Sequence, residues 1–481
     1  MRTVLSHLSV LALAGLLAAC NSTGNPSGSG GQGGNGSPSA GGNAADTSTS
    51  SGTGGTSGTG GSSAGTGGTR DAGSSSQGGS TGTSQTGGSG MGDGGVATGG
   101  RAGDGGVERG TGGSAGRATG GGGGSGGRSN GGSVADGGGT AGKECTPPTS
   151  YDNLFVTVSG HTQAESDDKV SKAWSTLFNP GGSGTIYFNG PGADESYVQD
   201  IYNNDVRSEG MSYGMMVAVQ LDHQTEFDRI WKWVKNHMAN GTGEISWSCK
   251  TSGAKNSSGG APDGEEYFAT ALIFASHRWG DSTGPGKIAY ATEAKWVLNV
   301  IRTKYFNSQY HLVKFVSSSS NVDPSYVLPA FYEVWACFDT ANADFWNESV
   351  SAARQFFHAA ADSNGVIGDR QTFTGDTLQG AGSDAKRCVM NIMMDHNFFA
   401  ADPWQVDTYA PAFGAYTYND MDSAQLPCNG LLGFALADSS GQHFVDNLWS
   451  QPLPTGTWRY YAGTLHMLAL LHVSGTFKLW Y

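Results

Sequence analysis

Three carboxylic acids lie where helices are predicted to begin. Glu209, Asp263 and Asp384 each follow a Ser or Pro that can open a helix. Two carboxylates beside one bond can act as general acid and general base, which is what hydrolysis requires. The alternative is that these acids only cap helices. Acids in a first turn interact favourably with the helix dipole. In addition, Asp263 with Glu266 three residues later has the form of a capping box. The surroundings of the three acids must therefore decide between the two.

The helix predicted around Glu209 has small residues in its first turns. Gly210 and Gly214 lie on either side of Tyr213, and each glycine costs about 1 kcal/mol relative to alanine in a helix. We therefore expect another part of the chain to approach this helix closely.

Flat apolar side chains accompany the acids. Trp247 precedes the Asp263 segment, Asp323-Pro324-Ser325-Tyr326 opens another predicted helix, and the chain has 12 Trp. A sugar ring stacks on an aromatic face while its hydroxyls bind carboxylates, and paired carboxylates then supply the acid and the base for glycoside hydrolysis. The combination favours a carbohydrate site.

The elements that must position these residues are mostly helices. After Thr162 the apolar residues recur mainly at three- and four-residue steps. With Ser, Asp, Asn, Gly and Pro as boundaries, the predicted helices cover 163–178, 209–222, 225–239, 264–279, 287–305, 324–339, 343–361, 384–400, 429–438, 441–450 and 459–473. No fixed-period repeat is visible, so we expect a closed array of helical hairpins or a helical solenoid.

Composition separates a linker from a folded domain. Of the 80 glycines in the 481 residues, 50 lie between Asn21 and Gly142, a segment without any Phe, Trp or Tyr. Such a segment cannot bury enough apolar surface to offset its ordering entropy. We predict a disordered Gly/Ser/Thr-rich linker over 21–142 and a folded domain over 143–481, which holds all 49 aromatic residues.

The first twenty residues have the layout of a signal peptide. Arg2 precedes an apolar run from Val4 to Leu17, and the segment ends Leu-Ala-Ala-Cys at Cys20. These last four residues resemble the lipobox of bacterial lipoproteins, in which Cys20 would be lipidated; ordinary cleavage, with Cys20 discarded or free, is the alternative. We expect an exported protein that is lipid-anchored to the cell envelope or secreted. Asn21 favours the outer membrane in a Gram-negative cell.

A lipid anchor would be the domain's only membrane contact, and the linker would give it a reach of about 60 Å. The domain carries 21 basic and 35 acidic residues, which disfavours a nucleic-acid or anionic-membrane partner and fits a neutral substrate. We expect a monomer.

Metal and serine chemistry lack their motifs. The 11 histidines form no His-Glu-x-x-His, and the domain has no Gly-x-Ser-x-Gly elbow. We therefore expect no metal, no other cofactor and no serine nucleophile. Without Cys20, the five remaining cysteines allow at most two disulfides, whose pairing the spacing leaves open.

The run Ala261–Trp279 resembles the signature of glycoside hydrolase family 8. It departs from the common pattern at Pro262, Glu265 and Phe268, and these departures resemble the xylan-directed branch of the family. Further segments match in order: Ser208–Met216 resembles the segment with the family's general acid, Asp384–Arg387 the segment with its general base, and Asp323–Tyr326 with Pro329–Tyr332 a stretch that lines the cleft. The similarity runs from about Tyr151 to Tyr481.

This resemblance implies an all-α fold, an (α/α)6 barrel of alternating inner and outer helices, with a cleft where inner helices begin. Glu209 would be the general acid, Asp384 the base that activates water, and Asp263 a carboxylate that holds the distorted sugar at the cleavage point. The family inverts configuration, so the carboxyls of Glu209 and Asp384 are expected to lie roughly 6.5–9.5 Å apart.

The resemblance also implies substrate-binding residues. Tyr326 and Arg387 would position the water and the base, Trp247 would stack on the sugar before the cleaved bond, and Tyr213 would join them in the site.

The pKa of Glu209 must be raised if this residue is the general acid. A helix start and the adjacent Arg207 both favour the ionised form. Burial and the repulsion from Asp263 and Asp384 must outweigh them.

The expected substrate is a β-1,4-linked polysaccharide or oligosaccharide, with xylan or xylo-oligosaccharides favoured and β-1,4-glucan or chitosan as alternatives within the family. A surface lipoprotein that only captures glycans is the non-catalytic alternative. It would require the loss of one of the two key carboxylates, Glu209 and Asp384, and both are present.

Exo-acting members resembling this chain carry a Leu-His-Pro loop that blocks the cleft. Here the corresponding region reads Leu426-Pro427-Cys428, which slightly favours cleavage within chains over release of xylose from the reducing end.

Overall fold

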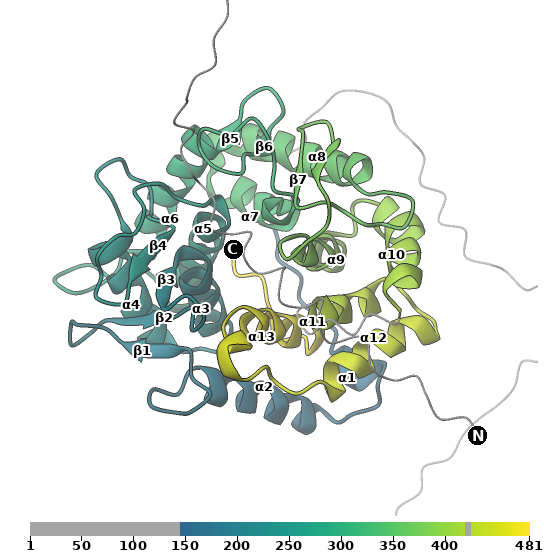
Figure 1. The fold of residues 1–481 in the computed structure, drawn as a ribbon, viewed down its shortest axis with the longest axis horizontal. Helices are drawn as coiled ribbons and strands as arrows, with labels where there is room; N and C mark the ends of the chain where they lie inside the picture. Colours follow the sequence, from purple (N-terminus) through teal and green to yellow (C-terminus); the bar gives the residue numbers. More distant parts are fainter. Residues whose placement is uncertain (1–144, 419–424) are drawn as a thin grey trace, which may run out of the picture. The chain divides into compact units, whose positions relative to one another are not determined.

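The computed structural model describes residues 145–418 and 425–481 (Figure 1). The predicted signal peptide with Cys20 and the predicted linker, 1–20 and 21–142, lie outside the described residues.

Inner helices form a closed ring around the centre of this domain (Figure 1). Each contacts the next in chain order, and the last contacts the first. These helices are α3 (Ser208–Gln220), α5 (Pro262–Trp279), α7 (Pro329–Phe338), α9 (Cys388–Phe399), α11 (Gln425–Asn429, continued by a 3-10 turn over Gly430–Phe434) and α13 (Tyr461–Val473).

Outer helices alternate with them along the chain and pack against them. They are α2 (Gln163–Leu177), α4 (Gln224–Trp233, then a π-helical turn Val234–Met238), α6 (Tyr290–Val300, then a π-helical turn Ile301–Tyr305), α8 (Ala343–Ala360), α10 (Ala410–Thr417, after a π-helical turn Gln405–Tyr409) and α12 (Ser439–Ser450). A short helix, α1 (Leu154–Thr157), precedes α2. The domain is thus an (α/α)6 barrel, as predicted.

Burial explains which helices lie inside. In α3 every residue except Glu209 is buried, and α13 is buried from Ala462 to Val473. A helix that is apolar on all sides must lie in the core. In α8, by contrast, the buried residues recur every three or four positions, for example Trp346, Val350 and Ala353, so that helix presents one face to the core.

The strands are short and form antiparallel pairs in the loops. They are β1 (Tyr187–Asn189) with β2 (Ser196–Val198), β3 (Asp205–Arg207) with β4 (Ser248–Lys250), β5 (Phe306–Asn307) with β6 (Leu312–Val313), and β7 (Arg370–Gln371) with β8 (Thr377–Gln379). The β3–β4 pair sets Arg207 opposite Ser248. It thereby brings Trp247 to the start of α3, where its carbonyl accepts a bond from the Ser208 amide at 2.9 Å.

The helix predictions missed one outer helix and misplaced one inner helix. The missed outer helix is α10, which has Pro411 in its first turn, and a side chain at Gly414 would press against Leu436. The helix predicted over 429–438 instead begins at Gln425, and helical structure ends at Phe434.

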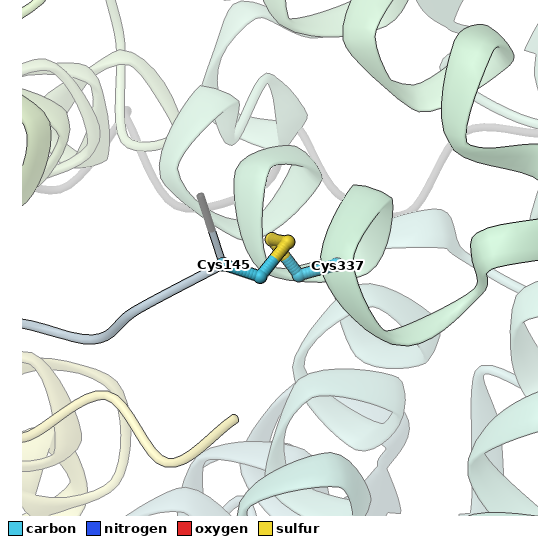
Figure 2. Close-up of a disulfide and its surroundings, with 2 residues drawn as sticks. All are labelled: Cys145 and Cys337. Carbon is cyan, nitrogen blue, oxygen red and sulfur yellow. A yellow bond between two sulfur atoms is a disulfide. The ribbon is translucent and has the colours of Figure 1, made fainter. Parts of the chain in front are cut away.

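The two ends of the chain that the structure describes lie against the C-terminal ends of inner helices. Cys145 forms a disulfide with Cys337 near the end of α7, with a Cα–Cα distance of 5.5 Å (Figure 2). At the other terminus, Lys478 and Gln220 at the end of α3 exchange two hydrogen bonds of 2.8 and 2.9 Å, and Arg278 lies over the Trp480 ring. Within the described residues, no helix is both long and apolar enough to span a bilayer.

Candidate active site

The predicted site residues gather at one end of the barrel, where inner helices begin. Glu209 and Asp263 are the second residues of α3 and α5, and Arg387 directly precedes α9. The hydroxyl of Tyr461, the first residue of α13, donates to the Ser383 carbonyl beside Asp384 at 2.9 Å. We call this end of the barrel the catalytic end.

Arg387 joins the three acids. Its Nη1 donates to Asp263 Oδ2 at 2.9 Å, to Glu209 Oε2 at 3.2 Å and to the Tyr213 hydroxyl at 3.0 Å. Its Nη2 lies 3.5 Å from Asp384 Oδ1. Because one planar guanidinium spans both bonds, Glu209 Oε2 and Asp384 Oδ1 are at most about 9 Å apart. This limit is compatible with the predicted separation, which stays a prediction.

The acids differ in their access to solvent. The side chains of Glu209 and Asp384 are 17% and 18% exposed, whereas those of Asp263 and Arg387 are 6% and 2% exposed. A group that exchanges protons with substrate and water must be reachable, and a group that holds the others in place need not be. The exposure pattern thus separates Glu209 and Asp384 from their buried partners.

The pKa of Glu209 is raised to about 7. Burial is the largest cause, and the charges of Asp263 and Asp384 raise the pKa further, against the opposing effects of Arg387 and Arg207. This is the balance that the sequence predicted. Burial likewise raises the pKa of Asp263, against the lowering effect of Arg387.

A tyrosine completes the surroundings of Glu209. Tyr460 donates to Glu209 Oε1 at 3.1 Å, and its ring lies so close to Gly210 that any Cβ there would collide with it. A Cβ on Gly214 would likewise lie 2.8 Å from Val198. The expected close approach to α3 is therefore confirmed.

The other two aromatic residues predicted for the site lie beside its arginines. Tyr326 is buried, and the Arg387 guanidinium carbon is 5.4 Å from its ring centre. Trp247 is half-buried, with the Arg207 guanidinium 5.5 Å from its ring centre. Arg207 in turn pairs with Asp200 and Asp205, each at 3.2 Å.

Sequence reasoning missed a second arginine at Asp384. Arg370 in β7 lies 3.5 Å from Asp384 Oδ2 and pairs more closely with the buried Asp323. The segment around Arg370 had no helical period and no motif, so nothing in the sequence singled it out. Tyr460 was missed because it lies 251 residues from its partner Glu209.

Two exposed aromatic rings adjoin the catalytic end. Tyr202 lies in the loop between β2 and β3, and Trp458 lies two residues before Tyr460. Their ring centres are 6.1 Å apart and their planes differ by 12°. Nearly parallel exposed rings are suitable faces for sugar stacking.

Comparison with known proteins identifies the family. Residues 192–425 match the model of glycosyl hydrolases family 8. The chain is 35% identical over 373 residues to a reducing end xylose-releasing exo-oligoxylanase of Halalkalibacterium halodurans, covering 69% of this chain and 95% of that protein. It is 33% identical to a reducing-end xylose-releasing exo-oligoxylanase of Paenibacillus barcinonensis, over 70% of this chain and 99% of that protein.

More distant and structural relatives agree. Endoglucanase 2 of Ruminiclostridium josui is 28% identical over 57% of this chain and 65% of that protein. A crystal structure of a reducing-end-xylose releasing exo-oligoxylanase complexed with xylose has a TM-score of 0.65 and 34% identity, covering 69% of this chain and 98% of that chain. This chain therefore belongs to glycoside hydrolase family 8, and it is a glycoside hydrolase built on the (α/α)6 barrel.

Proposed function

We propose that this protein is an inverting glycoside hydrolase that cleaves β-1,4-xylosidic bonds in xylan or xylo-oligosaccharides, with Glu209 as general acid and Asp384 as general base. The observation that supports this most is the Arg387 cluster. One guanidinium contacts Glu209, Asp263 and Asp384, while the pKa of Glu209 is raised to about 7. An acid that keeps its proton near neutral pH is what the leaving sugar requires.

In the proposed reaction, protonated Glu209 donates its proton to the glycosidic oxygen as the bond to the anomeric carbon breaks. Asp384 removes a proton from a water molecule, whose oxygen attacks that carbon from the opposite face. The Tyr460 hydroxyl donates a hydrogen bond to Glu209 Oε1, and Arg387 Nη1 donates one to Glu209 Oε2. Asp263, fixed by Arg387, accepts hydrogen bonds from the sugar at the cleavage point.

The relatives support xylose-based substrates. Those at 33–35% identity are named as exo-oligoxylanases and are covered over 94–99% of their lengths, whereas the endoglucanases are 28–29% identical and are covered over 65–72%. β-1,4-Glucan is therefore the second candidate substrate. The exposed rings of Tyr202 and Trp458 provide stacking faces for either sugar chain.

The mode of cleavage has two opposing indications. The relatives' names favour release of xylose from the reducing end. The Leu426-Pro427-Cys428 segment lacks the histidine of the blocking loop, which favours cleavage within chains. The backbone of this segment lies in α11. The Leu426 side chain and residues 419–424 lie outside the described residues.

Product analysis on xylohexaose with a free and with a reduced end tests both substrate and mode. Release of xylose and the shortened oligomer from the free-ended sugar, with no attack on the same bond of the reduced sugar, would establish the exo mode. A spread of intermediate oligomers from both would establish the endo mode. Lack of hydrolysis of xylan and xylo-oligosaccharides, with cleavage of β-1,4-glucan, would contradict the proposed substrate.

We also propose that the protein is exported and anchored to the cell envelope by a lipid on Cys20. The Leu-Ala-Ala-Cys sequence supports this. Cells fed radiolabelled palmitate should label the wild-type chain and not the Cys20→Ser variant, and equal labelling of both would contradict the proposal.

A further inference from the structure

Arg370 and its neighbour Asp369 hold the loop that carries Asp384. Asp369 Oδ1 accepts bonds from the Gly382 amide at 2.9 Å and the Ala385 amide at 2.8 Å, on the two sides of Asp384. A Cβ at Gly382 would collide with the Asp369 carboxylate, so the loop approaches as closely as a backbone can. Asp369 thus fixes the backbone around Asp384.

Arg370 holds the carboxylate of the same residue. Its Nη1 lies 3.5 Å from Asp384 Oδ2, while Arg387 Nη2 lies 3.5 Å from Asp384 Oδ1. Each carboxylate oxygen of Asp384 therefore has its own guanidinium. A carboxylate held at both oxygens has little freedom to rotate, which a base that must face one water molecule requires.

The position of Arg370 is itself fixed by the fold. Val322 and Gln371 exchange backbone hydrogen bonds of 2.9 and 3.0 Å, which sets Arg370 beside Asp323. The Arg370 guanidinium carbon lies 3.7 Å from the Phe315 ring centre. An ion pair to a buried acid and a ring beneath the guanidinium restrict its rotamers.

We propose that Asp369 and Arg370 are positioning residues for the general base, with Asp369 fixing the backbone of the loop and Arg370 fixing and charge-stabilising the Asp384 carboxylate from the side opposite Arg387. This inference rests on the proposed role of Asp384. It assigns to β7 a part in the reaction that requires no contact to substrate.

Several other groups set the electrostatic field at Asp384. The charged and titratable groups that face it are Glu209 on α3, Asp263 on α5, Asp323 and Tyr326 before α7, Asp369 and Arg370 in and beside β7, Arg387 and Cys388 at the start of α9, and Tyr461 on α13. Of these, Arg370 and Arg387 are the cations that contact the Asp384 carboxylate. Arg370→Gln removes one of these two contacts, so the carboxylate loses a neighbouring positive charge and a restraint on its orientation.

The test is the pH profile of kcat for Arg370→Gln on whichever substrate the wild type hydrolyses. The acid limb, which reports the base, should move up by about one pH unit, and kcat at its optimum should fall about tenfold or more. The alkaline limb, which reports the acid, should stay in place because Arg370 makes no contact with Glu209. A wild-type acid limb together with a wild-type kcat would overturn the inference.

Arg370→Lys keeps the charge but cannot reach Asp323 and Asp384 together, and it serves if Arg370→Gln does not fold. We expect a smaller rise of the acid limb and a kcat several-fold below wild type; wild-type values of both would overturn the inference.

Arg278→Gln is the matched control. The Arg278 side chain is 19% exposed, as is that of Arg370, and it pairs with one aspartate, but it lies at the end of α5 away from the acids. Its profile should equal that of the wild type.

Failure of the proposed function would look different. If the wild type does not cleave xylo-oligosaccharides, the substrate is wrong, and the pH comparison is made on the substrate that it does cleave. If Asp384→Asn keeps substantial activity, Asp384 is not the base and the proposed function fails together with this inference. If Asp384→Asn is inactive and Arg370→Gln is normal, only the positioning role fails.

Discussion

Two arginines of this domain bind carboxylates, and they do so in different ways. Arg354 on α8 bonds Asp395 through both carboxylate oxygens, at 2.7 and 2.8 Å, and Glu333 at 2.9 Å. Arg387 contacts three different carboxylates, each through a single oxygen, at 2.9 to 3.5 Å. The Arg354 cluster links α7, α8 and α9 inside the barrel, and the Arg387 cluster lies at the catalytic end.

The difference separates a structural from a functional charge cluster. At Arg354 the bidentate pair has short bonds at both carboxylate oxygens of Asp395, which fix both partners. At Arg387 each acid makes a single contact, and burial together with the charges of Asp263 and Asp384 raises the pKa of Glu209 to about 7. A raised pKa suits the acid role proposed for Glu209.

The largest expected effect comes from Glu209→Gln, which removes the exchangeable proton and keeps the shape of the side chain. We expect kcat to fall by about a thousandfold or more while substrate binding is kept. Initial rates and calorimetric titration with xylo-oligosaccharides measure the two. Substantial remaining activity would show that Glu209 is not the acid.

Arg354→Gln should affect folding and leave the chemistry intact. It leaves Asp395 and Glu333 buried without their cation, so we expect a loss of about 3–5 kcal/mol in the free energy of unfolding. Urea unfolding monitored by circular dichroism measures this loss, and kcat per folded molecule should equal that of the wild type.

Arg278→Gln is the control. Asp222, the partner of Arg278, is 63% exposed, so this variant should lose less than about 1 kcal/mol in the free energy of unfolding. Equal losses in both variants would contradict the contrast.

The pH profile tests the raised pKa of Glu209. With the pKa of Glu209 at about 7, its protonated form disappears as the pH rises, so kcat should fall about tenfold per unit above pH 7. Asp263 raises this pKa, so Asp263→Asn should move the alkaline limb to lower pH, whatever its effect on rate. An alkaline limb that stays in place would show that Asp263 does not act on Glu209.

The smallest expected effect is at the exposed ring of Trp458. Trp458→Ala removes one stacking face and should raise KM about three- to tenfold for long oligosaccharides, with kcat nearly unchanged. Tyr416→Ala is the matched control, because Tyr416 is also exposed but lies on the outer helix α10. If both substitutions raised KM equally, stacking at Trp458 would not be the cause.

The parts of the site that were predictable from sequence are those encoded within a few residues. Glu209, Asp263 and Asp384 each lie at a helix start, inside segments that resemble a family signature, and Arg387 follows Asp384 by three residues. The glycine at 210 also indicated a close neighbour, which proved to be Tyr460.

The parts that were not predictable depend on contacts between distant segments. Arg370 comes to Asp384 only because β7 pairs with the chain beside Asp323. The Cys145–Cys337 bond joins residues 192 apart, and no spacing rule could have selected that pair. The helix α10, with Pro411 in its first turn, was not predicted.

The disulfide also determines where a mechanical force enters the domain. A pull on the chain before Cys145 is transmitted through the sulfur bridge to Cys337 near the end of α7, and the segment from Thr146 to Asn153 is relieved of tension (Figure 2). From α7 the force spreads into its packing neighbours α5, α8 and α9. Because Cys337 and the acids lie at opposite ends of these inner helices, a force that enters at the disulfide must cross the length of the barrel wall before it reaches the acids.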